Sequence, residues 1–172
     1  MKKTSSVFFL LLFGCHLQLS AQSALAYKAL NPFDGRWKGE FRIYSFDGEL
    51  QQEIKVEQHY FWDNDTQRVV IRDTYPDGRT EVSKGKNYTE GYEIVCRVEK
   101  AGGEVTIHNG KLSGNRLFWS RKLPEQGLWE SFKEYVTRVD GETVYFIDGL
   151  GIYTSKGVRS ILIFEGRYRK QK

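Results

Sequence analysis

Five polar residues stand out as candidates for chemistry in a chain of mostly apolar and aromatic segments: His59, Arg72, Glu81, Tyr145 and Asp148. Arg72 and Asp148 interrupt apolar runs, and an inward arginine would receive a carboxylate head group well. Acid–base catalysis needs two such groups aimed at one reacting atom. The alternative is that all five face solvent. No catalytic residue is assigned, because the chain lacks a G-x-S-x-G elbow, a phosphate loop and metal-ligand spacing.

The other reactive groups indicate structure rather than a cofactor. Cys96 lies in Tyr92-Glu-Ile-Val-Cys-Arg-Val98 on the same strand face as apolar residues, so a buried small side chain is expected. Asp63-Asn-Asp65 lacks the other ligands and the glycine of a calcium loop, which favours a turn. The sequence therefore predicts neither a metal nor a cofactor.

Short alternating segments separated by turn residues make up the chain after Phe33. Aromatic and β-branched residues are dense, proline is rare, and pairs such as Asp47-Gly48 and Asn109-Gly110 supply the positive φ of tight turns. We expect about ten strands, near residues 36–46, 49–61, 67–75, 79–88, 92–99, 104–109, 116–122, 129–139, 142–154 and 158–169.

The short linkers favour pairing of each strand with the next, in antiparallel order. Ten such strands would curl, and closure into a barrel removes the exposed edges. The predicted fold is therefore all-β: one antiparallel up-and-down barrel domain over residues 27–172, with a short helical lead-in near residues 31–34 before its first strand. Residues 124–136 also fit helical spacing, but Gly127 and the β-prone run from Tyr135 to Val139 favour a strand.

A barrel of about ten strands has room for one small molecule. The aromatic residues are the expected wall and rim, with the inward arginine as a polar contact. The predicted ligand-binding residues are Phe41, Tyr60, Trp62, Arg72, Trp119, Trp129 and Tyr145.

The first predicted strand opens with a short motif, Gly35-Arg-Trp-Lys-Gly39. At the start of an all-β meander it resembles the G-x-W entry of the lipocalin/calycin superfamily, and W-x-G resembles nitrobindin-type and bacterial lipocalin-like domains. The resemblance implies that Trp37 plugs one end of the barrel, under a basic residue of the last strand, here Arg167 or Arg169. Nitrobindin-type barrels bind haem through a late histidine; none follows His108, so haem is not expected.

The N-terminus has the pattern of a secretory leader: Lys2 and Lys3, an apolar run over 7–13, then small residues. The run is too short to span a bilayer. Cleavage is expected after Ala21 or Ala26, or before Cys15 if Leu12-Phe-Gly-Cys15 acts as a lipobox. Localisation would then be periplasmic or extracellular, with a membrane anchor only if Cys15 is lipidated, in a host expected to be bacterial.

The charges argue against a nucleic-acid partner. Removing Lys2 and Lys3 leaves 24 basic and 22 acidic residues, interspersed and without a basic block. The sequence thus favours an exported protein that binds a small apolar or amphipathic molecule. A filled barrel acting as a cell-envelope interaction module and a barrel-type isomerase or cyclase are the alternatives. Neither ligand identity nor oligomeric state follows from the sequence.

Overall fold

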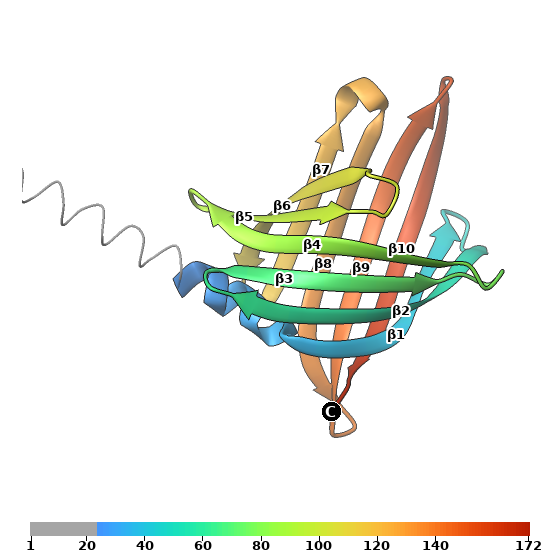
Figure 1. The fold of residues 1–172 in the computed structure, drawn as a ribbon. Helices are drawn as coiled ribbons and strands as arrows, with labels where there is room; N and C mark the ends of the chain where they lie inside the picture. Colours follow the sequence, from blue (N-terminus) through green and yellow to red (C-terminus); the bar gives the residue numbers. More distant parts are fainter. Residues whose placement is uncertain (1–23) are drawn as a thin grey trace, which may run out of the picture.

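Ten antiparallel strands follow one another along the chain, each hydrogen-bonded to the next, and the last returns to pair with the first. The computed structural model describes residues 24–172 (Figure 1). The strands are β1 (Gly35–Ser45), β2 (Leu50–Asp63), β3 (Thr66–Thr74), β4 (Thr80–Glu90), β5 (Glu93–Glu99), β6 (Val105–Ser113), β7 (Arg116–Leu123), β8 (Leu128–Val139), β9 (Glu142–Ser155) and β10 (Val158–Lys170). The predicted closed up-and-down barrel is confirmed.

Closure comes from β1 and β10, which pair from Trp37↔Lys170 to Ser45↔Leu162. This seam satisfies the backbone groups that two edge strands would otherwise expose. One seam is short: β6 and β7 pair only from Asn109↔Ser120 to Ser113↔Arg116. Residues 105–108 and 121–123 continue as strands beyond that ladder.

One predicted turn is wrong. Asn109-Gly110 lies inside β6, where Gly110 pairs with Trp119, and the chain turns instead at Gly114, whose φ is 62°. Gly110 serves packing rather than turning, because a Cβ at this position would lie 2.5 Å from the Trp119 ring. β6 is consequently longer than the predicted segment.

The ambiguous segment 124–136 is a strand for most of its length, as predicted. A single 3-10 turn, η2 (Pro124–Gln126), precedes β8. Gly127 ends this turn in the left-handed region, with φ at 62°, and its carbonyl accepts a hydrogen bond of 2.8 Å from the Thr154 amide.

A helical segment covers one end of the barrel, which we call the closed end (Figure 1). It consists of an α-helix over residues 24–30 and the 3-10 turn η1 (Asn31–Phe33), so it begins earlier than predicted. Four side chains of this segment are buried in the same core as the barrel residues: Ala26, Ala29, Leu30 and Phe33. The helix is therefore part of the barrel core.

Three polar contacts hold this segment in place. Trp37 Nε1 donates to the Phe33 carbonyl at 2.6 Å, and Gln67 Nε2 donates to the Leu30 carbonyl at 2.9 Å. Trp62 stacks on Tyr27, with 4.2 Å between ring centroids, and its Nε1 donates to Asn31 Oδ1 at 3.2 Å. The bonds from Trp37 and Gln67 satisfy backbone carbonyls that the end of a helix leaves free.

The predicted leader lies mostly outside the described residues, and so do Cys15 and Ala21. Among residues 24–172, no helix is long and apolar enough to cross a membrane.

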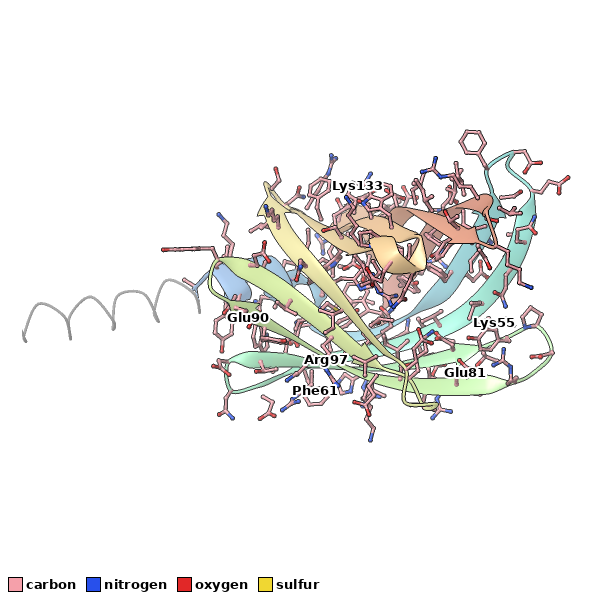
Figure 2. The ribbon with its side chains drawn as sticks, turned by 90° about the horizontal axis from the view of Figure 1, so that it is seen from above. Lys55, Phe61, Glu81, Glu90, Arg97 and Lys133 are labelled. Atoms are coloured by element: carbon pink, nitrogen blue, oxygen red, sulfur yellow. The ribbon has the colours of Figure 1, made fainter. Side chains whose placement is uncertain are left out.

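The barrel interior changes character along its axis. At the closed end Trp37, Tyr145 and Tyr168 are at most 1% exposed. Inward residues nearer the other end, such as Phe41 and Phe132, stay partly accessible although strands surround them. We call that end, formed by the hairpin loops after β1, β3, β5, β7 and β9, the open end. In Figure 2, β4 runs from Glu81 near the open end to Glu90 near the helix.

Candidate functional site

The wall of the open half is built from aromatic rings lying against inward glycines. The Phe132 ring lies over Gly149, where a Cβ would approach it to 2.3 Å, and Phe164 and Tyr153 lie over Gly151. Trp119 covers Gly110 in the same way. Glycine inside a strand commonly marks such close approaches.

A ring-to-ring contact continues this wall around the closure seam. Phe41 of β1 stacks on Phe164 of β10 with centroids 5.9 Å apart, and Phe164 stacks on Phe132 of β8 at 5.4 Å. All three side chains face inward. The result is an apolar belt across β1, β10 and β8, level with the middle of the barrel.

The carboxyl of Glu134 lies one inward position deeper than Phe132 on β8. It pairs across the strands with Leu117 and Ile147, both buried. Burial raises its pKa from 4.5 to about 7, which the Trp119 indole and the Tyr145 hydroxyl partly oppose as donors. The residue as a whole is nevertheless partly accessible. Since its side chain points inward, that accessible surface faces the interior.

Tyrosines form the floor below Glu134. Tyr145 is edge-on to Tyr60, with centroids 6.4 Å apart, and lies 5.2 Å from Tyr168. Burial raises the pKa of all three hydroxyls well above the usual value. The Tyr145 hydroxyl is fully buried and makes no hydrogen bond within normal geometry.

A polar cluster lies at the open end, beside the short β6–β7 seam. Glu130 accepts hydrogen bonds from Tyr153 Oη at 2.7 Å and interacts with His108 Nε2 at 3.0 Å; Arg121 Nη1 is 3.6 Å away. Three of these side chains are largely buried, with only 12–16% of their surface exposed: His108, Arg121 and Glu130. Although burial alone would raise the Glu130 pKa, its donors outweigh burial and lower it. We call these four residues the mouth cluster.

A second polar group occupies the opposite rim, on β3 and β4. Tyr75 Oη donates to Glu81 at 3.0 Å, and Arg79 forms an ion pair with the same carboxylate. Burial, and secondarily Glu81, raises the pKa of Asp73. Glu81, one of the five polar candidates from the sequence, therefore lies at the rim of the open end.

Five of the seven predicted ligand-binding residues lie on the inner faces of their strands: Phe41, Tyr60, Trp62, Trp119 and Tyr145. Of these, Tyr60 and Tyr145 belong to the packed floor. Trp62 is used at the closed end, against Tyr27. Arg72 and Trp129 lie on the outer face, because each falls on the alternate side of its strand from Ile71 and Glu130.

The cation over Trp37 is Lys170, whose Nζ lies 5.3 Å from the ring centroid. Arg167 and Arg169 point outward instead: Arg167 lies over Phe146 and Arg169 pairs with Glu142 at 2.7 Å. The physical reason is register, since Lys170 is the residue opposite Trp37 and shares its face. Trp37 itself is 1% exposed at the closed end.

His59 and Asp148 also lie on the outer face. His59 contacts Phe61, and Asp148 pairs with Lys133 at 2.8 Å. Figure 2 shows Phe61 and Lys133 on opposite walls of the barrel. Within residues 24–172, no three His, Cys, Asp or Glu side chains converge as metal ligands would.

The outer wall carries two grooves, of about 580 and 1010 Å³. The larger contains Arg167 and Arg169, and the smaller lies over β3–β5 with mainly charged lining residues. Neither reaches the aromatic belt. The interior, where apolar wall and buried polar groups converge, is the better candidate for a specific ligand site.

Sequence reasoning missed Glu130, Glu134, His108 and Arg121 as interior residues. A signal was present: the strand face of β8 that carries Phe132 and Val136 also carries both glutamates. Carboxylates on an otherwise apolar face are rarely buried without a role or a partner. The inward glycines were a second signal, visible as glycines inside strands rather than between them.

Comparison with known proteins identifies the fold. Neither a protein-family profile nor a curated protein sequence matches the chain. Among solved structures, the S-type phycobiliprotein lyase CPES from Guillardia theta superposes with a TM-score of 0.59 at 5% identity, over 88% of this chain and 97% of the lyase. Rv2717c from M. tuberculosis gives a TM-score of 0.54 at 14% identity, over 86% of this chain and 98% of its own. The chain thus shares its barrel fold with these two proteins.

Proposed function

We propose that the protein binds one small amphipathic molecule inside the open half of its barrel. The observation that carries this proposal is the inward-facing aromatic belt of Phe41, Phe132 and Phe164, in which Phe164 is buried but Phe41 and Phe132 stay partly accessible in the middle of the molecule. A core built only for stability would bury these rings fully, since protein interiors pack without voids.

The polar ends of the site make an amphipathic ligand a better fit than a purely apolar one. The mouth cluster offers a guanidinium, an imidazole and a hydroxyl near the open end, and the Glu134 carboxyl lies beyond the belt. Ligand pockets of this type combine an apolar wall with a few convergent polar groups. The similar barrel of a phycobiliprotein lyase agrees with the proposal without identifying the ligand.

Export is part of the same proposal. The charged and apolar N-terminal pattern supports a protein that acts in the periplasm or outside the cell, held at a membrane if Cys15 is lipidated. In subtype, the G-x-W opening supports a bacterial lipocalin-like or nitrobindin-type domain that does not use haem. The intact mass of protein recovered from the envelope tests both cleavage and lipidation.

The binding proposal is tested with N-phenyl-1-naphthylamine, a neutral dye that fluoresces in apolar surroundings. We compare the wild type with Thr106→Trp, which adds a large ring on the inward face of β6, and with Ile107→Trp, the next residue on the outward face. We expect saturable dye binding in the wild type and in Ile107→Trp, and its loss in Thr106→Trp. Equal binding by the two variants, or none by the wild type, would contradict an interior site.

A further inference from the structure

A single carboxyl group lies deep in the barrel without a compensating charge. Within residues 24–172, Glu134 forms no ion pair with any Lys, Arg or His. Glu130 lies two inward positions nearer the open end on the same strand, and it has Arg121 and His108 beside it. Its neighbours across the sheet are Leu117 and Ile147. A desolvated carboxylate is costly unless a cation or several donors accompany it.

The groups that face Glu134 are neutral or aromatic. They come from five strands: Trp119 on β7, Tyr145 on β9, Tyr60 on β2, Tyr168 on β10 and Cys96 on β5. Burial raises the pKa of the Cys96 thiol to about 12, and it also raises the pKa of each of the three tyrosine hydroxyls. None of these groups is therefore charged near neutral pH. The protein thus places a carboxyl group among aromatic rings, and within residues 24–172 no cation pairs with it.

We propose that the ligand carries a protonated amine, which binds with its ammonium group at Glu134 and its apolar body along the aromatic belt. This inference rests on the proposed function and names the ligand class. An ammonium group supplies the missing counter-charge, and indole and phenol rings are favourable neighbours for a cation. The Tyr145 hydroxyl, buried and without a hydrogen-bond partner, is a further polar group at this depth.

The spacing of the two glutamates sets the size of the ligand. Glu130 and Glu134 lie on the same face of β8, four residues apart, which corresponds to about 13 Å along a strand. A molecule anchored at Glu134 would span the belt and reach the mouth cluster with its other end. There the Arg121 guanidinium would donate to a polar or anionic group of the ligand. An amine with an apolar chain of intermediate length fits these dimensions.

The test compares octylamine, 1-octanol and octanoate, which share a chain and differ in head group, by isothermal titration calorimetry at pH 8. Glu134→Gln removes the charge and keeps the shape, and Glu165→Gln makes the same change on the outer face of β10. We expect octylamine to bind the wild type and Glu165→Gln at least about tenfold more tightly than octanol, since a tenfold change corresponds to one modest charge interaction. Glu134→Gln should lose that preference and keep its affinity for octanol.

The wild type alone provides a second readout. Octylamine affinity should rise between pH 5.5 and pH 8 as Glu134 gives up its proton, with no matching rise for octanol. The amine inference fails if octylamine binds Glu134→Gln as tightly as the wild type, or if octanoate is preferred. If the naphthylamine dye binds but the octyl series shows no preference for the amine, only this inference is overturned. If neither the dye nor any octyl compound binds the wild type, the proposed function fails with it. Should Glu134→Gln not fold, the pH profile of the wild type decides.

Discussion

Replacing Glu134 by glutamine should change how the stability of the barrel depends on pH. In the folded protein burial raises the pKa of this carboxyl from 4.5 to about 7. Between those values the folded state holds a proton that the unfolded chain has lost, so the free energy of unfolding falls as pH rises through this window. At 1.36 kcal/mol per pKa unit, the loss amounts to about 3 kcal/mol and is complete above pH 8. Glutamine cannot ionise and avoids this loss.

Urea unfolding followed by tryptophan fluorescence, at pH 5 and pH 8, measures the effect. At pH 5 the variant and the wild type should have similar unfolding free energies; at pH 8 the variant should be more stable by about 2–3 kcal/mol. Glu130 does not mask the result, because its pKa is lowered and its contribution changes only below the acid end of this range. If the difference between the two proteins is the same at both pH values, Glu134 is not a desolvated carboxyl and the amine inference loses its basis.

Three further predictions concern packing and reactivity. Trp37→Ala should cost about 3–5 kcal/mol of stability in urea unfolding, because it empties a buried site and removes the bond to the Phe33 carbonyl; a variant that unfolds like the wild type would refute a structural role at the closed end. Gly110→Ala should cost about 1–3 kcal/mol, since its Cβ would meet the Trp119 ring, whereas Gly102→Ala in an open loop should be neutral; equal effects would show that the ring does not lie on the glycine. Cys96 should react with an aromatic disulfide reagent at pH 8 about a thousandfold more slowly than a free thiol, and quickly once unfolded; fast labelling of the folded protein would contradict its desolvation.

The fold was largely predictable because its signals are local. Alternation and turn residues locate ten strands to within a few residues, and the short linkers leave a meander as the simplest arrangement. Asn109-Gly110 shows the limit of this reasoning. The same dipeptide favours a tight turn and also offers a glycine against which a ring can pack. In the structure Gly110 packs against Trp119 of the next strand, so the dipeptide lies within a strand instead of forming a turn.

The interior was less predictable because facing direction depends on register between strands. Arg72 and Trp129 sit among apolar residues in the sequence, yet each falls on the outward side of its strand. Similarly, Arg169 lies one position and Arg167 three positions from Lys170, the residue opposite Trp37, so both fall on the other face of the strand. A shift of one residue exchanges the two faces of a strand, so assignments of individual side chains need the ladder itself.

The helix seated on the closed end bears on how the protein would mature. Ala26 is 2% exposed and belongs to the core. A processing enzyme that cut after Ala26 would remove the first turn of the helix, leave a cavity above the barrel floor and place a new charged amino terminus beside it. A cut after Ala21 would leave the whole helix attached. Of the three leader cleavages that the sequence allows, only the cut after Ala26 would remove described residues of this helix, and the amino-terminal residue of the isolated protein would record which cut occurred.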